Sequence, residues 1–183
     1  MSWGSIDLGI VSFVGHIYFL LLPAILGGTL NMVFVKLPIL KPWQAPIDGG
    51  RTLRDGKRIF GDNKTWKGFF GMIALTALSA TLFWRNAFQY SYLCGALLGF
   101  AYVLFELPNS FVKRRLNIRS GENGGFAQTL FDQADSAIGY ALFMLFIYPL
   151  TLIEWISLAL VATVTHYIFN VLLFYLKLRG QKG

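Results

Sequence analysis

The segment 48–68 has the composition of a loop that grips a phosphorylated ligand. It contains six Lys or Arg, three Asp and five Gly residues. Cations bind phosphates, carboxylates hold a divalent metal, and glycines let the backbone approach a ligand closely. A basic loop that only orients a membrane protein needs neither the glycines nor the aspartates.

A second candidate is the acidic pair Asp132 and Asp135. On a helix these positions share a face, with Cβ atoms about 5–6 Å apart. Two such carboxylates can hold Mg²⁺ that also bridges phosphate oxygens. Alternatively, they form an N-terminal cap and an acidic first turn. The spacing alone does not decide between these interpretations.

The basic cluster Lys113-Arg114-Arg115 favours the metal interpretation. It precedes the aspartates in the same polar region, where it would repel a metal but attract phosphates. Opposite charges in one small region suit a site that binds a polyanion together with a cation. Asp48, Asp55 and Asp62 are interleaved with cations in the first loop in the same way.

Several other phosphate chemistries do not fit. From Gly56 the spacing is G-x4-G-x2-K-T, which departs from a Walker A loop. The spacings after Asp48 also depart from the signature of CDP-alcohol phosphatidyltransferases. Both histidines, His16 and His166, lie in apolar segments, so general base catalysis by His is not expected. Metal-assisted phosphoryl or nucleotidyl transfer is the better class.

These candidates must be positioned by membrane helices. The composition is 55% hydrophobic, and a spanning helix needs roughly 20 mostly apolar residues. We expect an all-α integral membrane protein that forms one polytopic domain over 1–183. Its two functional cytoplasmic loops are 37–66 and 113–130. Its five transmembrane helices lie near 9–36, 67–84, 88–112, 131–149 and 152–177.

The distribution of basic residues predicts the orientation. Fifteen of the sixteen Lys and Arg residues fall on one side of this arrangement, and Arg85 alone falls on the other. The positive-inside rule therefore places the N-terminus outside and the C-terminus in the cytoplasm. The net charge of +7 then indicates contact with lipid headgroups and soluble anions rather than with nucleic acid.

Some polar residues fall inside the expected spans. Pro23 breaks the first helix, either as a packing kink or beside a polar site at Asn31. Glu106 is costly at its depth, so it is either functional or paired with a nearby cation. His166 and Asn170 share a helix face and are expected to form interhelical hydrogen bonds.

Three motifs together resemble the CDP-archaeol synthase family. They are Gly56-Lys-Arg-Ile-Phe-Gly-Asp-Asn-Lys-Thr-Trp-Lys-Gly68, Ser110-Phe-Val-Lys-Arg-Arg115 and Asp132-Gln-Ala-Asp135. That family is small, has five spanning helices and is related to the phosphatidate cytidylyltransferases. The resemblance covers most of the chain, including the order of its loops.

The resemblance implies that a lipid phosphate attacks the α-phosphorus of CTP in a Mg²⁺-dependent reaction, giving CDP-lipid and pyrophosphate at the cytoplasmic face of the cell membrane. Asp132 and Asp135 would hold the Mg²⁺. Asp62 and Asp48 are further candidates for metal or ribose contacts. The basic residues expected to contact phosphates of CTP or of the lipid are Lys57, Arg58, Lys64, Lys113 and Arg114.

Two other functions stay open. A small transporter or a lipid-binding protein would use the loops for topology alone, and a transferase that consumes CDP-lipid would release CMP. The lipid itself is also open. The family expectation is 2,3-bis-O-geranylgeranylglyceryl phosphate, but phosphatidate presents the same headgroup.

Overall fold

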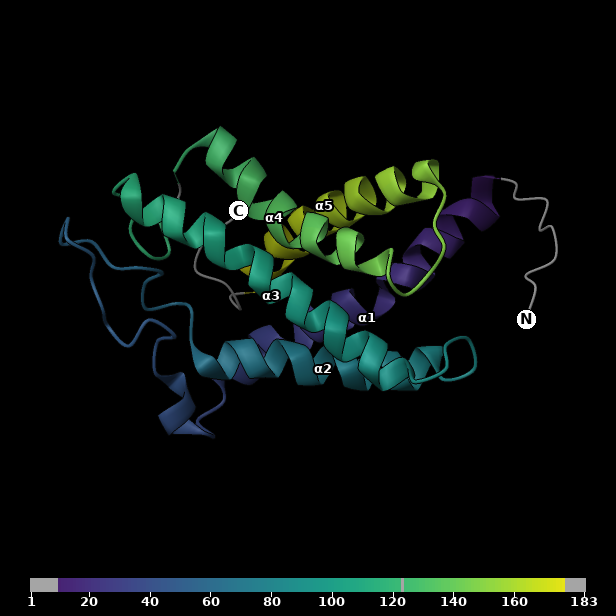
Figure 1. Cartoon of the computed structure of the whole chain (residues 1–183), viewed down its shortest axis with the longest axis horizontal. Coiled ribbons are helices and arrows are strands. Elements are labelled where there is room, and N and C mark those ends of the chain that lie inside the picture. Colours follow the sequence, from purple (N-terminus) through teal and green to yellow (C-terminus); the bar gives the residue numbers. More distant parts are fainter. Residues whose placement is uncertain (1–9, 123, 177–183) are drawn as a thin grey trace.

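The computed structural model describes residues 10–122 and 124–176. Its architecture is helical, with one short 3-10 helix, η1, before α2 (Figure 1). The expected all-α fold with five long helices is therefore confirmed. The elements are α1 (Ile10–Lys36), η1 (Lys41–Gln44), α2 (Trp66–Trp84), α3 (Ser91–Arg115), α4 (Phe126–Met144) and α5 (Leu152–Tyr175).

The helices run roughly along the long axis and pack side by side. Each packs against the next in the chain, and α1 also packs against α5. Figure 1 shows the segment 37–65, the end of α3 and the start of α4 together at one end of the molecule. The turns that join α2 to α3 and α4 to α5 lie at the other end. We call the end that holds the segment 37–65, the end of α3 and the start of α4 the polar end.

Four of the helices, α1, α2, α3 and α5, are long and apolar enough to cross a membrane. α4 is not among them, because Gln128, Asp132, Gln133 and Asp135 lower its hydropathy. Five spans and the orientation of the chain therefore stay predictions.

Three expected boundaries differ from those in the structure, two of them at the polar end. The fourth helix begins at Phe126 rather than near 131 and ends at Met144 rather than near 149. α3 continues to Arg115, so the expected loop 113–130 is shorter and the basic cluster forms the last turn of a helix. Cations suit that position because they face the negative end of the helix dipole.

Local signals account for where two helices begin. Thr65 caps α2, where its side-chain oxygen accepts a hydrogen bond of 3.1 Å from the backbone N–H of Gly68. Thr151 and Glu154 form a capping box at the start of α5, each side chain accepting from the other's backbone N–H. Both arrangements satisfy amide groups that the first helical turn leaves unpaired.

The proline break in α1 is resolved by side chains from two other helices. Pro23 has no N–H, so the carbonyl oxygen of Phe19 loses its helical partner. The indole N–H of Trp84 donates to that oxygen at 3.0 Å. The Tyr140 hydroxyl donates to the carbonyl of Leu20 at 2.7 Å. Both donors are buried in the core. Their hydrogen bonds to α1 connect α2 and α4 to that helix.

Small residues bring α3 close to α2. A Cβ atom at Gly95 would lie 2.5 Å from the Cβ of Ala80, and one at Gly99 would lie 2.9 Å from the backbone of Ile73. Such close approach without side chains is typical of helix packing in membranes. It fixes α3, which supplies much of the candidate site.

Candidate functional site

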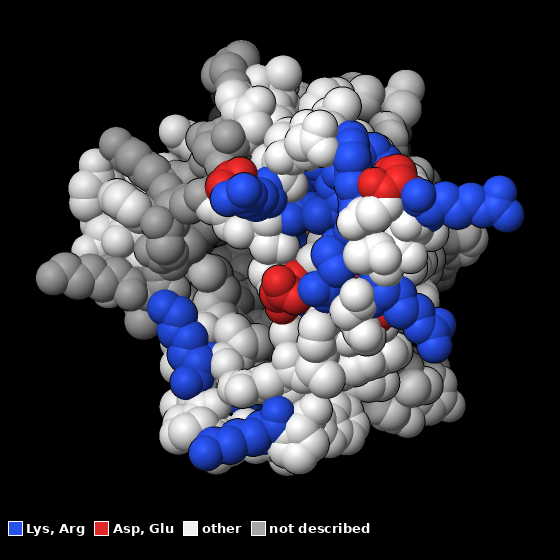
Figure 2. Space-filling model, turned by 90° about the vertical axis from the view of Figure 1, so that its left-hand side faces the viewer, with Lys and Arg blue, Asp and Glu red and all other residues white. Residues whose placement is uncertain are grey.

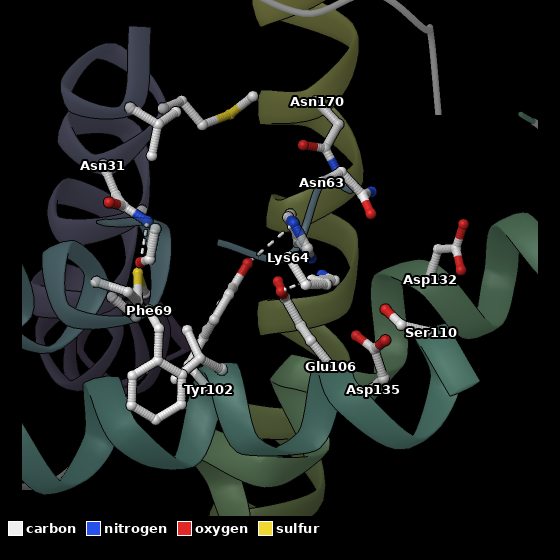
Figure 3. A pocket seen from close by; sticks show the side chains of 18 of the residues that line it. Asn31, Asn63, Lys64, Phe69, Tyr102, Glu106, Ser110, Asp132, Asp135 and Asn170 are labelled. Carbon is white, nitrogen blue, oxygen red and sulfur yellow. Dashed lines mark hydrogen bonds and ion pairs between the residues drawn. The ribbon is translucent and has the colours of Figure 1, made fainter. Parts of the chain in front are cut away.

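A cavity of about 880 Å³ opens between the helices. All five helices and the segment 37–65 contribute to its walls (Figure 3). Figure 2 shows Lys and Arg gathered over the polar end of the molecule, with acidic side chains between them. The charged side chains that line the cavity are Lys36, Lys64, Glu106, Lys113, Arg114, Asp132 and Asp135.

The two aspartates of α4 converge on one atom of α3. The Nδ2 atom of Asn109 donates to Asp132 Oδ1 and to Asp135 Oδ2, each at 2.7 Å. The two carboxylates therefore point to a common place, as residues three apart on a helix can do. They do not cap the helix, because the N-cap is Gly125 and the first turn holds no acidic residue.

Two more side chains fix this pair. Lys113 Nζ donates to Asp132 Oδ2 at 2.6 Å. Gln128 Nε2 donates to Asp132 Oδ1 at 2.9 Å and to Asn109 Oδ1 at 2.7 Å. These contacts hold Asp132 in one orientation and offset its charge.

The carboxylate pair fits a magnesium ion. Mg²⁺ in nucleotide sites usually takes one or two carboxylates and completes its shell with water and phosphate oxygens. Asp132 and Asp135 accept from the same nitrogen, Asn109 Nδ2, so a metal held by both carboxylates would have to replace that contact. Within the described ranges, no group of three or more His, Cys, Asp or Glu could hold a metal, so phosphates and water would have to supply the other ligands.

Lys64 reaches the cavity from the segment before α2. Its Nζ lies 2.5 Å from Glu106 Oε2 on α3, and the two side chains meet in the cavity in Figure 3. Burial lowers the pKa of Lys64, but the charges of Glu106, Asp135 and Asp132 outweigh it and raise the pKa above its ordinary value. The ammonium group is therefore charged. Of the two interpretations of Glu106, the structure shows pairing with a cation.

Arg114 carries a buried charge that has no acidic partner among the described residues. The residue is only 8% exposed, and its Nη1 donates to the Ser120 hydroxyl at 2.9 Å. No Asp or Glu of the described chain lies within ion-pair distance of it, and its Nε has no partner. A buried charge in this situation is costly. Because Arg114 also lines the cavity, an anionic ligand there would relieve that cost.

The other predicted contacts lie in a separate loop cluster around Asp48. The Asp48 carboxylate accepts from Arg58 at 2.6 Å and from the backbone N–H groups of Phe60 and Gly61 at 3.0 Å each. Burial raises its pKa, but these bonds outweigh burial and hold the pKa well below its ordinary value. Asp62 pairs with Arg58 at 2.6 Å.

Arg115 docks this loop cluster on α3. Its guanidinium donates to the carbonyls of Lys57 and Arg58 and pairs with Asp55. Lys57 Nζ in turn donates to the carbonyl of Arg115 at 2.7 Å. Lys57, Arg58 and Asp62 do not line the cavity, and their contacts with CTP stay predictions.

Four of the polar residues of α3 that line the cavity are Tyr102, Glu106, Asn109 and Lys113. Of these, only Lys113 was predicted from the sequence to contact a ligand. They recur at a spacing of three or four residues on α3, which is the signal of a polar face within an apolar helix. Gln128, four residues before Asp132 on α4, was missed; it does not line the cavity but donates to Asn109 and Asp132.

The interhelical role expected for His166 and Asn170 is confirmed. His166 Nε2 lies 3.0 Å from the Tyr102 hydroxyl, and Asn170 Nδ2 donates to Gln133 Oε1 at 2.5 Å. The two residues thus connect α5 to α3 and to α4.

Known proteins resemble this chain in sequence and fold. It is 35% identical over 145 residues to the CDP-archaeol synthase of Methanoculleus marisnigri, covering 72% of this chain and 85% of that protein. It is 33% identical over 149 residues to that of Pyrococcus abyssi, covering 76% and 84%.

A solved structure described as "Structural insight into an intramembrane enzyme for archaeal membrane lipids biosynthesis" matches with a TM-score of 0.64 at 24% identity, over 89% of this chain and 95% of that one. This likeness shows the fold, and four of the described helices are long and apolar enough to cross a membrane. The family model "CarS-like: CDP-archaeol synthase" matches residues 10–181. The chain therefore belongs to the CarS-like CDP-archaeol synthase family.

Proposed function

We propose that this protein transfers a cytidylyl group from CTP to a membrane lipid phosphate in a Mg²⁺-dependent reaction that releases pyrophosphate. The expected lipid is 2,3-bis-O-geranylgeranylglyceryl phosphate. The observation that carries the proposal is the convergence of Asp132 and Asp135 beside Lys64, Lys113 and Arg114, at one end of a cavity that continues between apolar helices.

The chemistry needs little from the protein beyond position and charge. An oxygen of the lipid phosphate attacks the α-phosphorus of CTP, and the bond from that phosphorus to the pyrophosphate oxygen breaks. The nucleophile is already an anion, so no side-chain base is required. Positioning two reactants can supply about 7–11 kcal/mol of the barrier. A bound Mg²⁺ would neutralise phosphate charge.

The residues divide these tasks. Asp132 and Asp135 would hold the metal, and Asn109 keeps their oxygens together. Arg114 would bind a phosphate, since its guanidinium has no acidic partner in the described chain and lines the cavity. Lys64 pairs with Glu106, and Lys113 pairs with Asp132. When the ligand is bound, each lysine would also donate to a phosphate oxygen.

The polar end would face the cytoplasm. The basic residues gathered there follow the positive-inside rule. CTP would enter from water at this end, and the lipid chains would lie between the helices.

A product assay tests the proposal. Purified protein in detergent is incubated with α-labelled CTP, Mg²⁺ and the geranylgeranylglyceryl phosphate. We expect labelled CDP-lipid together with one pyrophosphate per product, and neither without Mg²⁺. Binding of the lipid with no product would instead identify a transporter or lipid-binding protein. Release of CMP from added CDP-lipid and an alcohol would identify a CDP-lipid-consuming transferase.

A further inference from the structure

An exposed apolar surface lies at the polar end, outside the cavity. Figure 1 shows η1 next to the start of α2, set to one side of the helix bundle. Large apolar side chains of the segment after α1 and of the first turns of α2 are 40–52% exposed there. None of these described residues lines the cavity. We call them the rim cluster: Leu37, Ile39, Leu40, Trp43, Trp66 and Phe70.

Ring contacts join η1 to α2 within the rim cluster. The ring centroid of Trp43 lies 5.3 Å from that of Phe70, and Phe70 stacks on Trp66 at 5.7 Å. These rings cover one another only in part, because each is still 40–45% exposed. The three rings therefore form one surface that another molecule can contact.

The backbone holds the rim cluster in place at both ends of the segment that joins α1 to α2. Lys67 is only 1% exposed, and its Nζ donates to the carbonyl of Leu37 at 2.6 Å. The N–H of Trp66 donates to the carbonyl of Ala45 at 3.1 Å. The apolar side chains between these two points are thus presented outward on a defined surface.

The charged residues next to the rim cluster are cations. Within 36–47 they are Lys36 and Lys41, and that stretch contains no Asp or Glu. Both lysines are exposed. Tryptophan and lysine beside an apolar surface are typical of segments at the membrane interface, where lysine meets anionic lipid headgroups. Pro38 and Pro42 have no N–H, so the segment leaves fewer amides that need a partner close to lipid.

The rim cluster also continues an apolar row along α2. The residues Trp66, Phe70, Ala74, Leu78 and Leu82 follow one another at intervals of four, and all are exposed. Residues at that spacing lie on one face of a helix. Because α2 is long and apolar enough to cross a membrane, lipid that covers this face would also reach the rim cluster.

We propose that the rim cluster lies in the headgroup layer of the membrane, where Lys36 and Lys41 bind the phosphates of anionic lipids. This inference does not depend on the proposed reaction. Lys36 and Gln44 border the cluster in sequence and also line the cavity. The cluster would therefore hold the polar end of the cavity at the level of the lipid headgroups.

Spin labelling of the full chain in vesicles tests the proposal. Cys94 is the only cysteine, so Cys94→Ala provides a background for one label at Ile39→Cys. The matched control is a label at Arg54→Cys, since Arg54 is an exposed residue of the same segment in the loop cluster. In vesicles that contain an anionic phospholipid, we expect the ratio of collisions with oxygen to collisions with a water-soluble nickel chelate to be several-fold higher at position 39.

The same label tests the two lysines. Replacing the anionic phospholipid by a zwitterionic one should lower the ratio at position 39, and Lys41→Gln should lower it in the anionic vesicles. An unchanged ratio in both cases would overturn the assignment of the lysines.

Two other results would overturn the location of the rim cluster. Equal ratios at positions 39 and 54 would place the cluster in water. Protection of the label at position 39 from both reagents would show that a second copy of the chain or another protein covers it. Leu37→Cys provides a second label site if the Ile39→Cys protein does not fold.

Discussion

The cavity and the loop cluster around Asp48 both combine cations with carboxylates, yet they differ in how these charges are satisfied. In the loop cluster, the Asp48 carboxylate accepts from four residues of its own segment, namely from the guanidinium of Arg58 and from three backbone N–H groups. In the cavity, Arg114 has no acidic partner among the described residues. The charges of the loop cluster are thus paired with one another, whereas the cavity wall holds one buried cation with no acidic partner among the described residues.

The three consecutive cations at the end of α3 show the same division. Lys113 pairs with Asp132, Arg114 lines the cavity, and Arg115 holds the loop cluster against the helix. Successive residues on a helix point about 100° apart, so neighbours in sequence contact different parts of the molecule. A basic run is thus not one functional unit.

The largest effect is expected from the aspartates. Asp135→Asn or Asp132→Asn should lower CTP turnover by about 10³-fold or more, because metal-ion charge stabilisation contributes several kcal/mol. Glu122→Gln, which alters an exposed carboxylate, is the matched control and should retain activity. Folding is checked by thermal unfolding in detergent. Substantial CDP-lipid formation by a folded Asp135→Asn protein would remove the metal assignment.

The next effect separates the two arginines. Arg114→Gln should lower kcat/KM for CTP or the lipid by about 10–100-fold, since a hydrogen bond to a charged group is worth about 1.5–3 kcal/mol. It should not lower Tm, because the variant loses a buried charge that has no acidic partner among the described residues. Arg58→Gln should lower Tm, because it leaves Asp48 buried without its cation. A lower Tm for Arg114→Gln than for Arg58→Gln would contradict the assignment of Arg114 to the ligand and of Arg58 to the stability of the loop.

A smaller effect is expected from Asp48, the carboxylate at the centre of the loop cluster. Asp48→Asn should destabilise the segment 46–62 by about 2 kcal/mol, because charge-assisted hydrogen bonds from Arg58 and backbone amides are weakened. Hydrogen exchange of the amides of Phe60 and Gly61 measures this directly. Activity should fall less than in the aspartate variants of α4. Unchanged exchange at these amides would show that the carboxylate does not hold the loop.

The smallest effect is a pH dependence confined to the same segment. Asp48 has a lowered pKa in the folded protein, so its stabilisation is complete above the ordinary carboxyl value of about 3.9 and is lost as the pH falls further. Exchange or limited proteolysis of the segment between pH 5 and pH 3 should show protection that declines only below that value. The Asp48→Asn protein should show no such decline.

Parts of the fold and the site could be predicted because they depend on local pattern. Apolar runs located the long helices, and the i, i+3 spacing placed Asp132 and Asp135 on one face. The start of α4 was misplaced by five residues because polar residues such as Gln128 and Thr129 resemble a loop in sequence, whereas in the structure they form the helix that carries the aspartates. The stripe from Tyr102 to Lys113 on α3 was visible in sequence as spacing but not as a cavity wall.

The amino-acid sequence alone determined the helical class, the concentration of charge at one end and the shared face of the aspartate pair, because each follows from neighbours within a few residues. Only the tertiary structure decided that Asn109 donates to both aspartates and that Lys64 pairs with Glu106. It also decided that Arg58 pairs with Asp48 and does not line the cavity. These partners lie 10 to 42 residues apart. All except Arg58 and Asp48 meet only because α3 packs against its neighbours. Residues that carry the same charge in the sequence therefore contact different partners only once the helices have packed together.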